Sequence, residues 1–168
     1  MIFFIKLLKK ISQFSSLRNI ELFIYGNDQF QPEIEKEYFK NLDLKCKWKF
    51  LPNDRKISYK ILDQSNLIVG THSTLVYEAL GRGAKVFVFS KKINDNLLVT
   101  HKFAWPYKLK SEGFFWSNNF LKNDNFFQKL EKIYKMDEVR WKTKVEKKVC
   151  NIMVYDELNS KFRNFLNL

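Results

Sequence analysis

The sequence predicts an α/β fold: a single Rossmann-like domain in which helices cover a parallel sheet and C-terminal helices pack on it. Two observations indicate this class. Short β-rich runs alternate with segments of helical apolar spacing through the first ninety residues. The chain has 168 residues, 45% of them hydrophobic, which is enough for one proper core. Because no internal repeat or linker interrupts the pattern, we expect residues 1–168 to form one domain.

The first elements follow from turn residues and apolar spacing. We expect a helix at 4–14, a strand at 21–25, a helix at 32–41, a strand at 47–51 and a helix at 57–63. Gly26-Asn27-Asp28 and Pro52-Asn53-Asp54 end the two strands, and Pro32 suits the first turn of the second helix.

The first predicted helix is amphipathic and basic. Lys6, Lys9 and Lys10 interrupt its apolar side, so it is not a secretory signal, and no apolar run approaches the ~20 residues of a membrane span. The helix either covers the sheet or rests on an anionic membrane surface. We therefore expect a cytoplasmic protein, with peripheral contact at the inner face of the membrane as the alternative.

The most informative segment is residues 65–89, which predict a strand, a loop, a helix and a second strand. Leu67 to Val69 are apolar and end in Gly70, where the backbone can approach a ligand closely. Thr71, Ser73 and Thr74 follow at the start of a helix expected at 75–82. Free N–H groups and the helix dipole make such a loop a natural site for a phosphate or diphosphate. Any of these hydroxyls could instead cap the helix.

His72 lies in the same loop. It could be a structural side chain. Because the unperturbed pKa of histidine is near 6.5, it could instead hold phosphate as a cation or act as a proton carrier. It is the one weak candidate for a catalytic residue. Arg82 and Lys85, which flank the glycine at the end of the helix, are expected to be solvated cations.

The second half is less regular. After a strand at 86–89, residues 90–122 form a long aromatic segment without periodicity, followed by helices at 123–135, at 138–150 and at about 155–166. The helix at 138–150 is rich in lysine. The net charge is +12, with 13 basic and 9 acidic residues in 1–84 and 17 and 9 in 85–168.

This charge predicts an anionic partner. Nucleic acid is the less favoured partner, because the aromatic residues are not interleaved with Lys and Arg as a base-stacking surface requires. Cys46 and Cys150 lie far apart, without metal-ligand spacing, and predict reduced structural thiols. The sequence contains no P-loop, no Gly-x-Gly-x-x-Gly and no metal-ligand cluster.

Several motifs together resemble the C-terminal, donor-binding half of GT-B-type glycosyltransferases, and most closely those of bacterial lipopolysaccharide or capsule biosynthesis. The motifs are Trp-Lys-Phe-Leu-Pro at 48–52, Ser-Tyr-Lys-Ile-Leu-Asp at 58–63, Ser-Asn-Leu-Ile-Val-Gly at 65–70, Ser-Thr-Leu-Val-Tyr-Glu-Ala-Leu-Gly-Arg-Gly at 73–83, Phe-Ala-Trp-Pro at 103–106, Glu-Gly-Phe-Phe-Trp at 112–116 and Met-Val-Tyr-Asp at 153–156, with Asn159 following. The first part of the 73–83 motif also occurs in nucleotide-sugar epimerases.

The resemblance implies a nucleotide-sugar donor site. Ser73 and Thr74 would face the diphosphate, Glu78 would accept hydrogen bonds from the ribose, and Pro52 and Asn53 would lie near the base. A surface carboxylate favoured by the helix dipole is the alternative for Glu78. Such enzymes use no resident metal or other cofactor, since protein dipoles and cations stabilise the departing diphosphate.

The chain departs from the family pattern in one respect. Fewer than fifty residues precede the resemblance, so the acceptor domain of a full enzyme is missing, and we expect a fragment, a split gene product whose acceptor domain is a separate chain, or a relic. Two alternatives remain: a nucleotide-sugar epimerase of similar fold, and a non-catalytic basic binding module docked on a membrane or a partner.

Overall fold

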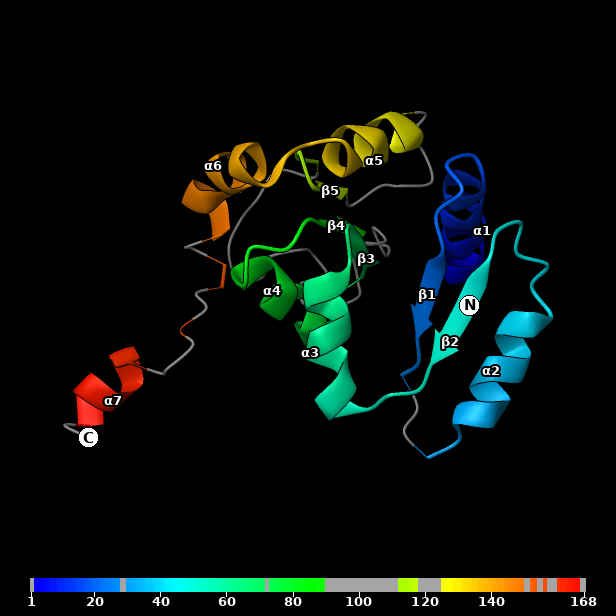
Figure 1. The fold of residues 1–168 in the computed structure, drawn as a ribbon, viewed down its shortest axis with the longest axis horizontal. Coiled ribbons are helices and arrows are strands. Elements are labelled where there is room, and N and C mark those ends of the chain that lie inside the picture. The colour runs from blue at the N-terminus through cyan, green and yellow to red at the C-terminus, as the bar shows by residue number, and fades with distance from the viewer. Residues whose placement is uncertain are drawn as a thin grey trace, which may run out of the picture. The chain divides into compact units, whose positions relative to one another are not determined.

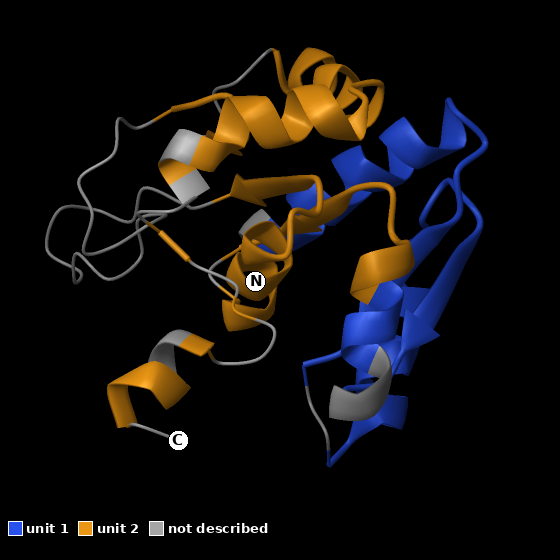
Figure 2. Ribbon diagram, turned by 60° about the vertical axis from the view of Figure 1, so that its left-hand side comes forward, with its two compact units in different colours: residues 1–61 blue, residues 62–168 orange. Residues whose placement is uncertain are grey.

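The computed structural model describes residues 2–27, 30–71, 73–89, 112–117, 125–149, 152–153, 156 and 160–166. They divide into two compact units, residues 1–61 and 62–168 (Figure 2). Helices and short parallel sheets make up both units, so the predicted α/β class is confirmed. Whether the chain is a single domain stays a prediction.

Unit 1 holds a two-stranded parallel sheet. Its elements are α1 (Ile2–Ser16), β1 (Leu22–Tyr25), α2 (Pro32–Lys40), β2 (Trp48–Leu51) and the greater part of α3 (Arg55–Gln64) (Figure 1). Leu22 pairs with Trp48 and Tyr25 with Leu51. Pro32 stands in the first turn of α2, where a missing N–H costs no hydrogen bond.

One face of this sheet forms the core of unit 1. Leu8 of α1, Ile24 of β1 and Phe39 of α2 are buried together, and Trp48 and Phe50 of β2 pack against them. Phe23, which alternates with these residues along β1, is 45% exposed. Alternate strand residues point to opposite faces, so the apolar positions of β1 and β2 decide which face the helices cover.

Unit 2 is built around a three-stranded parallel sheet in the order β3-β4-β5. Its elements are β3 (Ile68–Gly70), α4 (Thr74–Gly81), β4 (Val86–Phe89), β5 (Trp116–Ser117), α5 (Phe126–Tyr134), α6 (Glu138–Val149) and α7 (Ser160–Leu166). Ile68 pairs with Val86 and Val88 with Trp116, both in parallel register.

Helices cover both faces of β4. All four of its residues are buried, as expected for the central strand of a parallel sheet. Figure 1 shows α4 on one side of β4 and α5 on the other. The Phe89 ring lies 5.2 Å from the Phe126 ring of α5, and the Phe115 ring lies 5.7 Å from the Trp141 ring of α6. The C-terminal helices α5 and α6 therefore pack on this sheet, as predicted.

The glycine predicted to end α4 does so. Gly83 has a φ of 89°, a left-handed conformation that favours glycine. Its N–H donates to the Leu80 carbonyl at 3.0 Å, and the Ala84 N–H donates to the Ala79 carbonyl at 3.0 Å. This pair of bonds satisfies two carbonyls that the helix end would otherwise leave free, and it turns the chain into β4.

One strand was missed by the sequence analysis. Residues 90–122 were expected to be irregular, yet Trp116–Ser117 form β5 and extend the sheet beside β4. The aromatic residues predicted at 103–107 lie outside the described residues. The other predicted elements match the observed ones to within a few residues, apart from the last helix, which begins at Ser160.

Candidate functional site

The predicted anion-binding loop lies at the carboxyl end of β3. β3 ends at Gly70, Ser73 is the N-cap residue of α4, and α4 begins at Thr74. β3, β4 and β5 run parallel, so their carboxyl ends share one edge of the sheet. Ligands of open α/β sheets bind at this edge, which gives the loop the position expected of a binding site.

Ser73 does not cap α4 with its side chain. Its backbone is extended (φ −66°, ψ 132°), its carbonyl accepts the Val76 N–H at 3.0 Å, and its hydroxyl makes no capping hydrogen bond. Ser73 and Thr74 are both exposed, and Thr71 is half-buried. The capping alternative is therefore wrong for the Ser73 hydroxyl, which faces solvent at the positive end of the helix dipole.

Gly70 has a packing role that the sequence analysis did not foresee. A β-carbon at this position would lie 2.4 Å from the Cγ2 atom of Val76. Val76 is one of the buried residues of α4. The missing side chain thus lets α4 pack closely against the end of β3.

Glu78 is half-buried one turn after Thr74 on α4. Its backbone carbonyl accepts the Arg82 N–H at 2.9 Å in the last turn of the helix. A carboxylate at this distance from the helix start can accept hydrogen bonds from a ligand whose anionic group occupies the first turn. His72 lies outside the described residues, and its predicted roles stay predictions.

Two cations at the other end of α4 are half-buried and bonded to protein groups, contrary to the expectation that they would be solvated. The Arg82 guanidinium forms an ion pair with the Asp63 carboxylate of α3, with its Nε atom 3.0 Å from Oδ1. Lys85 donates to the carbonyls of Tyr134 and Met136 at 3.2 and 2.7 Å. Because these partners are distant in sequence, no local pattern could indicate them.

Pro52 and Asn53 follow β2 in unit 1, where Asn53 joins the ends of two strands. Its Oδ1 atom accepts the Tyr25 hydroxyl at 3.0 Å, and its Nδ2 atom donates to the Asn27 carbonyl at 3.0 Å. Tyr25 also contacts the Ser58 hydroxyl of α3. The sequence analysis missed this role of Tyr25. The Asn53 amide is engaged within unit 1, and its predicted place near a nucleotide base stays a prediction.

A pocket of about 460 Å³ lies near the start of the strands of unit 1. It is lined by Ser15 and Ser16 at the end of α1, by Asn19 and Ile20, and by residues 44–47 before β2. Burial raises the pKa of the Cys46 thiol in this lining. The pocket lies by the amino ends of β1 and β2, away from the sheet edge where open α/β sheets bind ligands.

The comparisons with known proteins give the family. A family model described as "putative O-antigen biosynthesis protein" matches residues 4–168. The chain belongs to this O-antigen biosynthesis family. No curated protein and no solved structure matches the chain. The match covers nearly the whole chain, and it assigns the protein to surface-carbohydrate biosynthesis, as the motifs around Ser73–Gly83 led us to expect.

Two further observations describe this O-antigen family member. Within the described ranges, no group of three or more His, Cys, Asp or Glu side chains could hold a metal ion. None of the helices in the described part of the chain has the length and apolar character needed to cross a bilayer.

Proposed function

We propose that this O-antigen family member is the donor-binding domain of a GT-B-type glycosyltransferase, and that it binds a nucleotide-activated sugar at the start of α4. The observation that carries the proposal is the exposed Ser73 hydroxyl, which is not used to cap the helix that it begins. It stands beside Thr74 at the carboxyl edge of a parallel sheet. Family membership supports the surface-glycan part of the proposal.

Each group at the α4 terminus has a role in this proposal. The N–H groups of Thr74 and Leu75 in the first turn and the hydroxyls of Ser73 and Thr74 donate to the diphosphate. The helix dipole favours the negative charge there, typically by 0.3 to ~1 kcal/mol at an exposed site. The Glu78 carboxylate, one turn further on, accepts hydrogen bonds from ribose hydroxyls.

The reaction that fits this arrangement is glycosyl transfer. An acceptor hydroxyl attacks the anomeric carbon, the bond from that carbon to the diphosphate oxygen breaks, and the nucleoside diphosphate leaves. Donors fixed at the diphosphate stabilise the charge that develops on this leaving group, without a resident metal or cofactor. We assign the base that takes the acceptor proton to an acceptor-binding domain outside residues 1–168, in the same or another polypeptide. The proposal places the protein in the cytoplasm.

Calorimetric titration tests donor binding. The protein is titrated with UDP, CDP and GDP and with their sugar conjugates. We expect saturable binding of one nucleotide series, weakened about tenfold or more in Glu78→Gln and in Thr74→Val, because each variant loses a hydrogen bond to a charged or polar ligand group. The matched controls Glu146→Gln and Thr143→Val change the same side-chain types on α6 and should bind as the parent does.

Three results would overturn the proposal. One is the absence of saturable binding to any of these nucleotides. The second is binding that the two α4 variants leave unchanged. The third is conversion of a free nucleotide sugar without any acceptor, which would identify the epimerase alternative instead.

A further inference from the structure

The exposed side of α6 carries a row of cations. Arg140, Lys144 and Lys148 are spaced four residues apart, which places them along one face of the helix, and all three are exposed. Trp141 and Val145, which are 0% and 3% exposed, lie next to this row on the helix surface and hold the adjoining face of α6 in the core of unit 2. We call Arg140, Lys144 and Lys148 the α6 stripe.

Two members of the α6 stripe lie over aromatic rings. The Lys144 ammonium is 4.8 Å from the centroid of the Phe114 ring, and the Lys148 ammonium is 4.9 Å from that of Trp116. Such contacts hold the aliphatic stem on an apolar surface and leave the charged end in water. These contacts already restrict the two lysine side chains, so less side-chain entropy is lost when a partner binds.

Most of the positive charge of the α6 stripe is not neutralised by a neighbouring carboxylate. Within the described ranges, no carboxylate pairs with Lys144 or Lys148. Among the same residues Arg140 pairs with Asp137 alone, its Nε atom 3.3 Å from Oδ2, and both side chains are mostly exposed. Three lysines of unit 1 differ in this respect. Lys36, Lys40 and Lys45 of unit 1 each have a carboxylate partner within 3.6 Å. A charged partner would therefore meet a net positive field at α6 rather than at those lysines.

The chemistry of this surface favours a lipid headgroup layer over nucleic acid. A surface that binds single strands stacks bases on exposed aromatic rings. The indoles next to the α6 stripe are buried, with Trp116 3% and Trp141 0% exposed. What α6 offers is a row of exposed cations along a helix surface, which suits a plane of phosphate groups.

We propose that the α6 stripe docks the protein on an anionic phospholipid bilayer. The proposal does not depend on the donor site at α4, and its test uses no nucleotide.

Flotation with vesicles of phosphatidylglycerol and phosphatidylcholine tests the docking. The variant Arg140→Gln/Lys144→Gln/Lys148→Gln should bind on the order of 100-fold more weakly than the parent, since each cation near an anionic surface contributes about fivefold. Binding of the parent should fall as salt rises and should be absent with phosphatidylcholine alone.

Two matched variants remove the same number of positive charges elsewhere. Lys36→Gln/Lys40→Gln/Lys45→Gln should bind within about twofold of the parent, because these lysines already face carboxylates. Lys6→Gln/Lys9→Gln/Lys10→Gln tests the basic helix α1. The variant Arg140→Lys/Lys144→Arg/Lys148→Arg keeps the charge of the stripe and should bind as the parent does, which separates charge from any defect in folding.

The proposal is overturned by any of the following results. The α6 variant and the unit 1 variant lose binding equally, so that only total charge matters. The α1 variant abolishes binding while the α6 variant keeps it. The parent fails to float with anionic vesicles, or it retains duplex or single-stranded nucleic acid through the α6 stripe and ignores the vesicles.

Discussion

Gly70 and Val76 are packed so closely that a β-carbon on the glycine would lie 2.4 Å from the valine Cγ2 atom. The contact joins the last residue of β3 to the first buried residue of α4. It therefore fixes the start of α4, with Ser73 and Thr74, against the carboxyl edge of the sheet. The geometry of the candidate donor site depends on this contact.

Gly70→Ala should destabilise the protein by about 1–3 kcal/mol, because a well-packed contact cannot admit another methyl group without strain. In a Val76→Ala background the same change should cost at least ~1 kcal/mol less, since the clashing methyl is gone. Urea unfolding of the four proteins of this cycle measures the coupling. Gly83→Ala is the control: its cost comes from the φ of 89° and should not depend on residue 76. Equal costs of Gly70→Ala in both backgrounds would refute the packing role.

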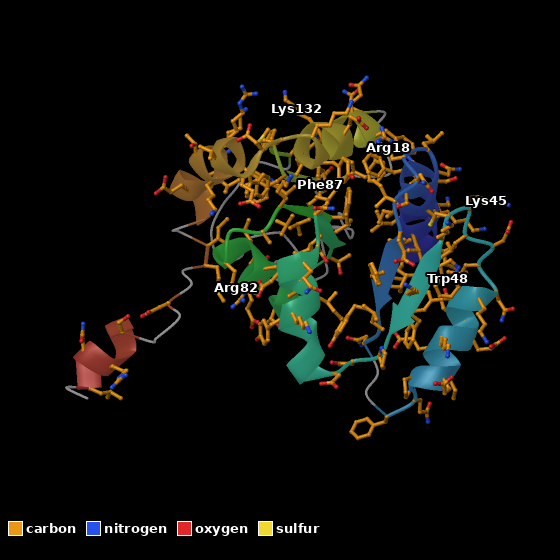
Figure 3. All side chains as sticks on the ribbon, viewed as in Figure 1. Arg18, Lys45, Trp48, Arg82, Phe87 and Lys132 are labelled. Carbon is orange, nitrogen blue, oxygen red and sulfur yellow. The ribbon has the colours of Figure 1, made fainter. Side chains whose placement is uncertain are left out.

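Lys85 connects the start of β4 to the end of α5 by donating to the carbonyls of Tyr134 and Met136. Replacing it by Met should lower the free energy of unfolding by roughly 1.5–3 kcal/mol, because charged hydrogen bonds to two carbonyls at a helix C-terminus are lost. Lys132→Met is the matched control. Lys132 is exposed in the last turn of the same helix (Figure 3), and its loss should change stability by less than about 0.5 kcal/mol. Thermal and urea unfolding would contradict the prediction if both variants behaved alike.

Tyr25 and Asn53 hold together the carboxyl ends of β1 and β2. Tyr25→Phe should cost about 1–2 kcal/mol, because the Asn53 and Ser58 groups lose a part-buried partner. The comparison is Tyr38→Phe. The Tyr38 hydroxyl makes no hydrogen bond among the described residues, so its loss should change stability by under about 0.5 kcal/mol. Hydrogen exchange should also show faster opening at the amides of Gly26 and Asn27 in Tyr25→Phe. Unchanged exchange there would rule out the bracing role.

Burial raises the pKa of the Cys46 thiol, so less thiolate is present at a given pH than in an unfolded chain. In Cys150→Ser, which leaves Cys46 as the only thiol, iodoacetamide should react more slowly with the folded protein than with the urea-unfolded one near neutral pH. The raised pKa also makes the stability of the folded protein depend on pH. The folded state holds this proton more tightly, so stability falls as the pH rises from the ordinary thiol pKa through the folded one. Equal alkylation rates in both states would show that the thiol is not perturbed.

Local patterns account for most of the elements. Gly26, Pro32, Pro52 and Gly83 act on their own backbone, and short continuous apolar runs mark β1 and β4. A two-residue strand is too short to form such a run, so β5 at Trp116–Ser117 could not be predicted. The same holds for the separation of the strands into two sheets, which depends on pairing between segments distant in the chain.

The sequence by itself determined the α/β class, the order of the elements apart from β5, and the loop of hydroxyl residues before α4, because each depends on residues within a few positions of one another. Only the tertiary structure decided what the individual side chains do there. In the folded chain Arg82 pairs with Asp63, Lys85 donates to carbonyls at the end of α5, and Asn53 accepts from Tyr25, across 19 to 51 residues of sequence. The Ser73 hydroxyl makes no hydrogen bond that caps α4. Hydrogen bonds and close packing form between groups that folding brings together, and a short stretch of sequence does not identify the distant residues that it will contact.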